Sequence, residues 1–252
     1  MSLKQTIAAA ALSTTGLVSA ALAQDRPVII LVHGAWANGS SWERVVPMLQ
    51  AEGLTVHAVH NSAASFESDV AATRRVIDDQ PGAVILVGHS YGGAVITEAG
   101  TNDKVRALVY VAAFAPAAGE SVNSIVGQHG QPVWFGEIHA DAGGYLTWAS
   151  EGMAKYFAPD LPAGESALLA AVQAPLFAGA FDGKVSRPAF AEKPSWFLIA
   201  DQDQIIPPPL QQFFAARMGA TVKHAAASHA VILSQPGAVA EAILAAVGGS
   251  TE

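Results

Sequence analysis

The chain has 252 residues, which is enough for one large domain whose core needs neither disulfides nor a structural metal. It contains no cysteine, which excludes disulfide scaffolds, thiol nucleophiles and cysteine-ligated zinc. The formal net charge is -8 and the 13 Lys and Arg residues are scattered, so we expect no binding of nucleic acid or anionic lipid.

The first 23 residues have the composition of a secretory signal peptide. Lys4 precedes an uncharged stretch from Ile7 to Ala20, and Ala21-Leu22-Ala23 has the small residues of a cleavage site. A short buried N-terminal helix is the alternative. Because no other segment is long and apolar enough to span a bilayer, we predict a mature chain, 24–252, that is periplasmic or secreted and leaves the membrane after cleavage.

Short apolar runs alternate with amphipathic segments along most of the chain. The predicted strands cover residues 27–34, 55–60, 83–89, 105–114, 195–200 and 221–227. The predicted helices cover a segment capped by Ser40 or Ser41 and ended by Gly53, then 69–79, 92–100, 209–218 and 236–247. Strands that are apolar on both faces and separated by helices indicate an α/β fold with a mostly parallel, doubly wound sheet.

The pattern breaks after residue 114. Gly and Pro are scattered there among eight aromatic residues, and no strand pattern is evident before residue 188. Because so long a structureless loop is uncommon inside a compact domain, we predict an inserted helical cap at about 115–190 within a single domain, 24–252.

The segment Gly88-His89-Ser90-Tyr91-Gly92 lies between an apolar strand and a helix, which is the context of a G-x-S-x-G nucleophile elbow. Small flanking residues allow the strained turn that exposes the Ser90 hydroxyl. A serine nucleophile needs a histidine base and a carboxylate that orients it. Of the eight histidines, His229 is chosen because it follows the last predicted strand; Asp201 and Asp203 both follow the strand 195–200.

These motifs resemble the α/β-hydrolase superfamily, in the small serine esterase branch that includes plant hydroxynitrile lyases and methyl-ester hydrolases. The resemblance implies the chain order Ser90, Asp203, His229, and the spacing of Asp203 from Pro207 favours it over Asp201. Glu120 is a weaker substitute for the acid. The segment "VHGAW" resembles the oxyanion loop of the family, which implies the backbone amides of Ala35 and Tyr91 as donors.

The predicted reaction is hydrolysis of a carboxylic ester through an acyl-enzyme, with a small-molecule ester as the partner and without metal or organic cofactor. Aromatic residues in the cap favour a largely apolar substrate, and packing of the cap onto the core is the alternative role for any one of them. The predicted substrate-binding residues are Gly34, Trp36, Trp134 and Trp148.

Two alternatives use the same fold. Hydroxynitrile lyases of this branch have a threonine and a lysine at the positions of Gly34 and Ala230, which disfavours cyanohydrin cleavage here. A non-catalytic small-molecule receptor is expected to have a broken triad or to turn over very slowly, whereas all three residues are present in this chain.

Overall fold

A six-stranded sheet forms the centre of the protein. The computed structural model describes residues 26–129 and 132–250, so the predicted signal peptide, 1–23, lies outside the described residues. The strand order is β2-β1-β3-β4-β8-β9, and every neighbouring pair is parallel. The strands are β1 (Val28–Val32), β2 (Val56–Val59), β3 (Val84–His89), β4 (Val105–Val111), β8 (Ser195–Ala200) and β9 (Thr221–Ala225). All six predicted strands are confirmed; β8 has the predicted bounds, and the other five are slightly shorter.

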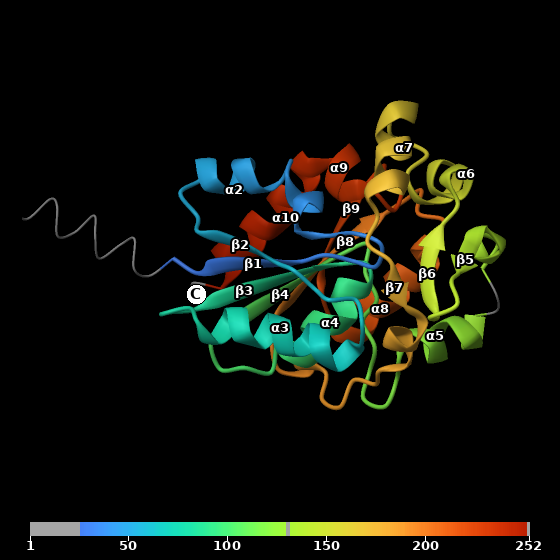
Figure 1. Ribbon diagram of the computed structural model, residues 1–252. Helices are drawn as coiled ribbons and strands as arrows, with labels where there is room; N and C mark the ends of the chain where they lie inside the picture. Colours follow the sequence, from blue (N-terminus) through green and yellow to red (C-terminus); the bar gives the residue numbers. More distant parts are fainter. Residues whose placement is uncertain (1–25, 130–131, 251–252) are drawn as a thin grey trace, which may run out of the picture.

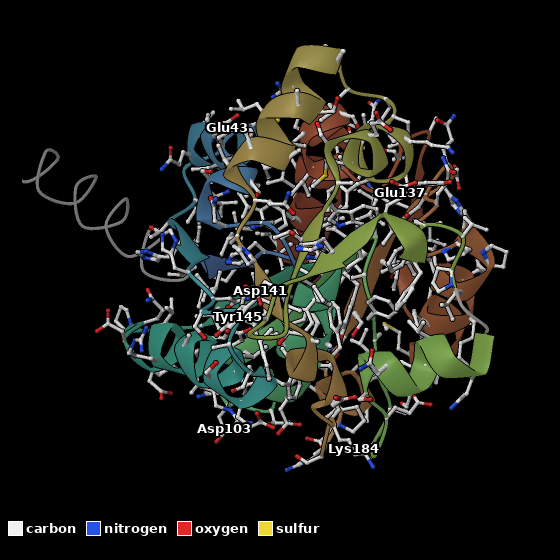
Figure 2. The ribbon with its side chains drawn as sticks, turned by 45° about the vertical axis from the view of Figure 1, so that its right-hand side comes forward. Glu43, Asp103, Glu137, Asp141, Tyr145 and Lys184 are labelled. Atoms are coloured by element: carbon white, nitrogen blue, oxygen red, sulfur yellow. The ribbon has the colours of Figure 1, made fainter. Side chains whose placement is uncertain are left out.

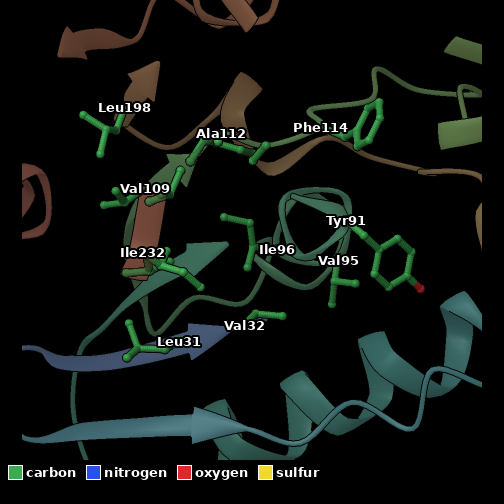
Figure 3. Packing of buried hydrophobic residues seen from close by; sticks show 14 of the residues in the cluster. Leu31, Val32, Tyr91, Val95, Ile96, Val109, Ala112, Phe114, Leu198 and Ile232 are labelled. Atoms are coloured by element: carbon green, nitrogen blue, oxygen red, sulfur yellow. The ribbon is translucent and has the colours of Figure 1, made fainter. Parts of the chain in front are cut away.

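Helices cover both faces of this sheet, as predicted (Figure 1). One face carries α2 (Val46–Ala51) and α10 (Pro236–Gly249), and the other carries α3 (Phe66–Asp78), α4 (Tyr91–Ala99) and α8 (Pro208–Met218). In Figure 3, Ile96 of α4 points toward the strands, while the phenol of Tyr91 points away from them. Because apolar side chains meet the sheet from both sides, all six residues of β3 are buried, up to the turn that holds Ser90.

The first predicted helix differs from the structure. A short 3-10 helix, η1 (Gly39–Trp42), precedes α2, and its N-cap is Asn38 instead of Ser40 or Ser41. The Asn38 side chain accepts the Ser40 amide at 2.9 Å, and the Ser41 hydroxyl accepts the Asn38 amide at 3.3 Å. This reciprocal capping places the N-cap two residues before Ser40 and three before Ser41.

The region between β4 and β8 forms a cap at one end of the sheet (Figure 1). It contains the predicted helices, but also a three-stranded antiparallel sheet in the order β5-β6-β7 that the prediction of a helical cap lacks. These strands are too short to show a clear alternation of polar and apolar residues. The cap elements are α5 (Val122–His129), η2 (Phe135–Glu137), β5 (Ile138–Ala140), β6 (Tyr145–Trp148), α6 (Ser150–Gly152), η3 (Met153–Phe157), α7 (Ala163–Val172), β7 (Leu176–Phe177), η4 (Ala178–Asp182) and η5 (Ala189–Ala191).

Figure 2 turns the cap toward the viewer, with Glu137, Asp141 and Tyr145 labelled on it. The remaining element, α9 (Val231–Ser234), joins the His229 loop to α10. Within residues 26–129 and 132–250, none of the helices combines the length and the apolar character that crossing a membrane requires.

Candidate active site

The turn at Ser90 has the strained geometry that the sequence predicts. β3 ends at His89, α4 begins at Tyr91, and Ser90 between them has φ 54° and ψ -124°. A β-carbon on Gly88 would lie 2.6 Å from the carbonyl oxygen of Gly92, and one on Gly92 would lie 2.4 Å from that of Val32. Since real β-carbons do not approach so closely, both positions require glycine, and the predicted elbow is confirmed as a local structure.

His229 and Asp203 meet Ser90 at this turn. The His229 Nε2 atom lies 2.8 Å from the Ser90 Oγ atom, and the His229 Nδ1 atom lies 2.8 Å from the Asp203 Oδ2 atom. His229 is 0% exposed, Asp203 3% and Ser90 4%. A neutral imidazole that donates its Nδ1 proton to the carboxylate leaves Nε2 free to accept the serine proton. The structure thus brings together three side chains that are distant in the sequence.

The Asp203 carboxylate accepts four hydrogen bonds. Its Oδ1 atom accepts the amides of Ile205 at 2.7 Å and Ile206 at 3.0 Å. Its Oδ2 atom accepts His229 and also the side-chain amide of Gln211 at 2.9 Å. All four contacts thus hold the carboxylate in a fixed orientation toward His229.

Gln211 is a residue of the site that sequence reasoning missed. It is fully buried in α8, and its side chain also donates to the carbonyl of Ile206 at 2.7 Å and accepts the amide of Ala200 at 3.1 Å. The signal in the sequence is its spacing. Gln211 lies four residues before Ala215 and three before Phe214, which places a polar side chain on the buried face of the helix.

The two other carboxylates considered as the acid point elsewhere. Asp201 pairs with His224 at 2.7 Å, and the two side chains are 44% and 53% exposed. Glu120 pairs with Arg217 at 2.9 Å. Neither is therefore engaged with His229, and Asp203 is the carboxylate next to the imidazole.

Two further histidines are buried below the site. The Nδ1–H group of His33 donates to the carbonyl of Gly34 at 2.8 Å, and its Nε2 atom accepts the amide of Asn61 at 3.1 Å. The Nε2–H group of His89 donates to the carbonyl of His229 at 2.9 Å. Burial lowers the pKa of His33 and lowers that of His89 to about 3, so both rings stay neutral near pH 7.

His89 is expected to make stability depend on pH. Burial, and next the neighbouring His229, lowers its pKa from 6.5 in the unfolded chain to about 3. Because the unfolded chain binds the proton more tightly, the stabilising contribution is complete above pH 6.5 and is lost as the pH falls toward 3. We expect the free energy of unfolding to fall by about 2 kcal/mol more between pH 7 and pH 5 in wild type than in His89→Gln, whose amide can still donate to residue 229.

Urea unfolding at the two pH values measures this difference, and His224→Gln at the exposed pair with Asp201 is the matched control. If the free energy of unfolding fell equally in wild type and in His89→Gln, His89 would be protonated at pH 5 in the folded protein as well as in the unfolded chain.

The two predicted oxyanion donors lie beside Ser90. Ala35 and Tyr91 both line the same cavity as the serine. Tyr91 is the first residue of α4, where a backbone N–H has no acceptor within the helix. The Tyr91 hydroxyl donates to the buried Asp69 at 3.1 Å, which raises the pKa of the phenol beyond the effect of burial. This bond anchors the first turn of α4 to α3.

A cavity of about 270 Å³ opens over the Ser90 hydroxyl. Its lining is Ala35, Trp36, Ser90, Tyr91, Phe114, Val122, Asn123, Val126, Trp134, Phe135, Ile138, Leu146, Ala178, Phe181 and Ile205. Among these described residues none has a charged side chain. The cavity is therefore suited to an uncharged, mostly apolar group.

Two of the four predicted substrate-binding residues, Trp36 and Trp134, line this cavity, and two do not. Trp148 is 4% exposed and packs behind the cavity wall, with its ring 5.5 Å from Trp36 and 5.3 Å from Trp134. Gly34 lies next to Ser90, and a β-carbon added at Gly34 would be 2.7 Å from the Ser90 Cβ atom. Trp148 thus supports the lining, and Gly34 leaves room for the serine.

A strand-to-helix turn that carries serine, with a buried histidine and aspartate behind it, is the site that α/β hydrolases share. The sequence pattern of the Alpha/beta hydrolase family matches residues 29–242, and the chain belongs to this family. The resemblance stated from the motifs is confirmed.

Among curated proteins, the chain is 34% identical over 111 residues to a pyrethroid hydrolase of Sphingobium wenxiniae, covering 39% of this chain and 40% of that protein. It is 35% identical over 113 residues to a carbendazim hydrolyzing esterase of Nocardioides sp., covering 38% of this chain and 46% of that protein. The matched stretches thus span less than half of either relative. A crystal structure of a pyrethroid hydrolase superposes with a TM-score of 0.78 at 27% identity, covering 90% of this chain and 99% of that one.

Proposed function

We propose that the protein is a carboxylic ester hydrolase, with Ser90 as nucleophile, His229 as general base and Asp203 as the acid that orients it. The observation that carries this proposal is the pair of 2.8 Å contacts that joins the three side chains beside the cavity. The names of the relatives, a pyrethroid hydrolase and a carbendazim hydrolyzing esterase, support ester cleavage as the reaction.

The reaction proceeds through an acyl-enzyme. Ser90 Oγ forms a bond to the ester carbonyl carbon while His229 Nε2 takes the hydroxyl proton, and the amides of Ala35 and Tyr91 stabilise the oxyanion. The carbonyl re-forms as the bond to the alcohol oxygen breaks, and the imidazolium gives its proton to that oxygen. Water then attacks the acyl-serine with His229 again as base, which releases the carboxylic acid and restores Ser90.

The cavity indicates the kind of ester. Because its described lining is aromatic and aliphatic and has no cation to pair with a carboxylate, we propose small, largely apolar esters as substrates. Cyanohydrin cleavage has less support, because the site has no room for the threonine that hydroxynitrile lyases of this branch have at the position of Gly34. A β-carbon added at Gly34 would lie 2.7 Å from the Ser90 Cβ atom.

The test is covalent labelling of the nucleophile. We expect a fluorophosphonate to add once to the wild-type protein, with the added mass on the peptide containing Ser90, and we expect p-nitrophenyl acetate to be hydrolysed until that label is complete. Ser90→Ala should not be labelled. Turnover that persists after full labelling, or a label on another residue, would refute Ser90 as the nucleophile.

We also propose that the protein is periplasmic or secreted, on the composition of residues 1–23. The mass of the protein recovered after expression in its host checks this proposal. A chain that retains its first 23 residues would contradict it.

A further inference from the structure

The loop that carries His229 is held by the cap on both sides of the histidine. The amide of Ser228 donates to the Asp160 Oδ2 atom at 2.8 Å, and the Ser228 hydroxyl donates to the Asp160 Oδ1 atom. On the other side, the amide of Ala230 donates to the carbonyl of Phe157 at 3.1 Å. One cap segment, 157–160, therefore fixes both chain neighbours of the imidazole.

A π-helical turn places this segment. Within η3 the amide of Ala158 donates to the carbonyl of Met153 at 2.9 Å, and such widened turns are frequent at functional sites. The turn leaves the carbonyl of Phe157 free to accept the amide of Ala230, and Asp160 follows three residues after Phe157. The Phe157 ring stands edge-on to the His229 ring, with centroids 4.9 Å apart and planes at 79°. The same turn thus covers the imidazole and holds its backbone.

The body of the fold also holds the His229 loop, where the amide of Gln202 donates to the carbonyl of Ala227 at 3.0 Å. β9 ends at Ala225 and α9 begins at Val231, so residues 226–230 lie outside regular secondary structure. From the sheet, His89 donates to the carbonyl of His229 at 2.9 Å. The amides of residues 228 and 230 are both directed to the cap. The position of the imidazole therefore depends on Asp160 and Phe157 as well as on His89.

We propose that Asp160 is a positioning residue through which the cap, besides lining the substrate cavity, holds His229 at the distance that proton transfer from Ser90 requires. The inference rests on the proposed hydrolase function. Asp160 does not touch the reacting atoms; it acts through Ser228. Because displacements of about 1 Å in a catalytic group can cost about 10²-fold in rate, losing two hydrogen bonds next to His229 should slow the chemical step.

The decisive variant is Asp160→Ala, which removes both acceptors at a residue that is exposed in the folded protein. We expect kcat for p-nitrophenyl acetate to fall about 10-fold to 100-fold, with KM within about twofold of wild type, because the cavity lining is unchanged. Asp160→Asn should keep kcat within about threefold of wild type. Its oxygen can accept the Ser228 amide, while its NH2 group donates to the Ser228 hydroxyl, whose own proton then goes to the carbonyl of Phe157, 3.2 Å away.

Glu165→Ala is the matched control. Glu165 also joins the cap to the body of the protein, through an ion pair of 2.6 Å with Arg44. Its loss should leave kcat unchanged, since Glu165 binds only one terminal nitrogen of Arg44, and the other still donates to the carbonyl of Leu233 in α9, beyond residues 226–230. Equal losses in the Asp160 and Glu165 variants would show that any loosened cap slows the enzyme, and would overturn a specific role for Asp160.

Ser228→Ala tests the same contact from the other side. The variant loses the hydroxyl but keeps the amide, so we expect a smaller fall in kcat than in Asp160→Ala. In the double variant the two effects should combine to less than their product, because both remove one shared interaction. Strictly multiplicative effects would mean that the two residues act independently.

Hydrogen exchange of the Ser228 and Ala230 amides provides a readout that does not require turnover. We expect both amides to exchange faster in Asp160→Ala than in wild type or Glu165→Ala. Unchanged exchange, or a kcat within twofold of wild type, overturns the proposal. If wild type itself fails to hydrolyse esters, the proposed function is wrong, and the exchange rates still decide whether Asp160 holds the His229 loop.

Discussion

Replacing His229 by alanine is expected to lower kcat by about 10⁶-fold, as is typical when the base of a serine hydrolase is removed. The fully buried ring lies between the Ser90 hydroxyl and the Asp203 carboxylate, and in the part of the chain that the structure describes no second imidazole is hydrogen-bonded to that hydroxyl. His89 is nearby, with ring centroids 4.9 Å apart, but its Nε2–H group is committed to the carbonyl of residue 229. Without His229, the hydroxyl is a weak nucleophile.

Single-turnover and steady-state rates with p-nitrophenyl acetate measure this effect, and circular dichroism checks that the variant is folded. His224→Ala is the matched control, because that ring is half exposed and pairs with Asp201 away from the cavity. A His229→Ala protein that retains more than about 1% of wild-type kcat would exclude an imidazole base, since general bases usually contribute 10² to 10⁴ or more.

The order of strands and helices could be predicted because the buried strands are nearly continuous apolar runs. β3 is buried at every residue, and the sequence has no polar side chain there before its last residue, His89. The cap was harder. The strands β5, β6 and β7 have two to four residues each, and β7 pairs only Leu176 and Phe177 with β6. So short a strand is stabilised by tertiary contacts, such as the bond from the Phe177 amide to the carbonyl of Ala63, and leaves no periodic pattern.

The three triad positions followed from local chemistry and chain order, whereas the residues that hold them did not. Gln211 and Gln212 are identical in type, yet only Gln211 is buried against Asp203. Ser228 and Asp160 are 68 positions apart and carry no motif that links them. Such partners depend on how a loop of the cap folds back over the sheet. That information lies in tertiary packing, and single-sequence patterns do not report it.

Asp203→Asn is expected to lower kcat by about 10⁴-fold, and the reason is specific to the bonds around this carboxylate. Oδ1 accepts two backbone amides, those of Ile205 and Ile206. An asparagine oxygen is best placed there, because two buried donors would otherwise lack an acceptor. The asparagine NH2 group then faces His229 Nδ1 and donates to it. The imidazole is left with its proton on Nε2, where it cannot accept the proton of Ser90.

Asp201→Asn is the matched comparison, two residues earlier on the same loop. Its side chain is 44% exposed and contacts His224 instead of the buried histidine, so kcat should stay within about twofold of wild type. Kinetics of both variants between pH 6 and pH 9 give the rates, and the imidazole NH signals in an NMR spectrum report which nitrogen of His229 carries the proton. A nearly silent Asp203→Asn beside a severely impaired Asp201→Asn would mean that Asp203 is a structural carboxylate, and that the loop rearranges to bring Asp201 to His229 during catalysis.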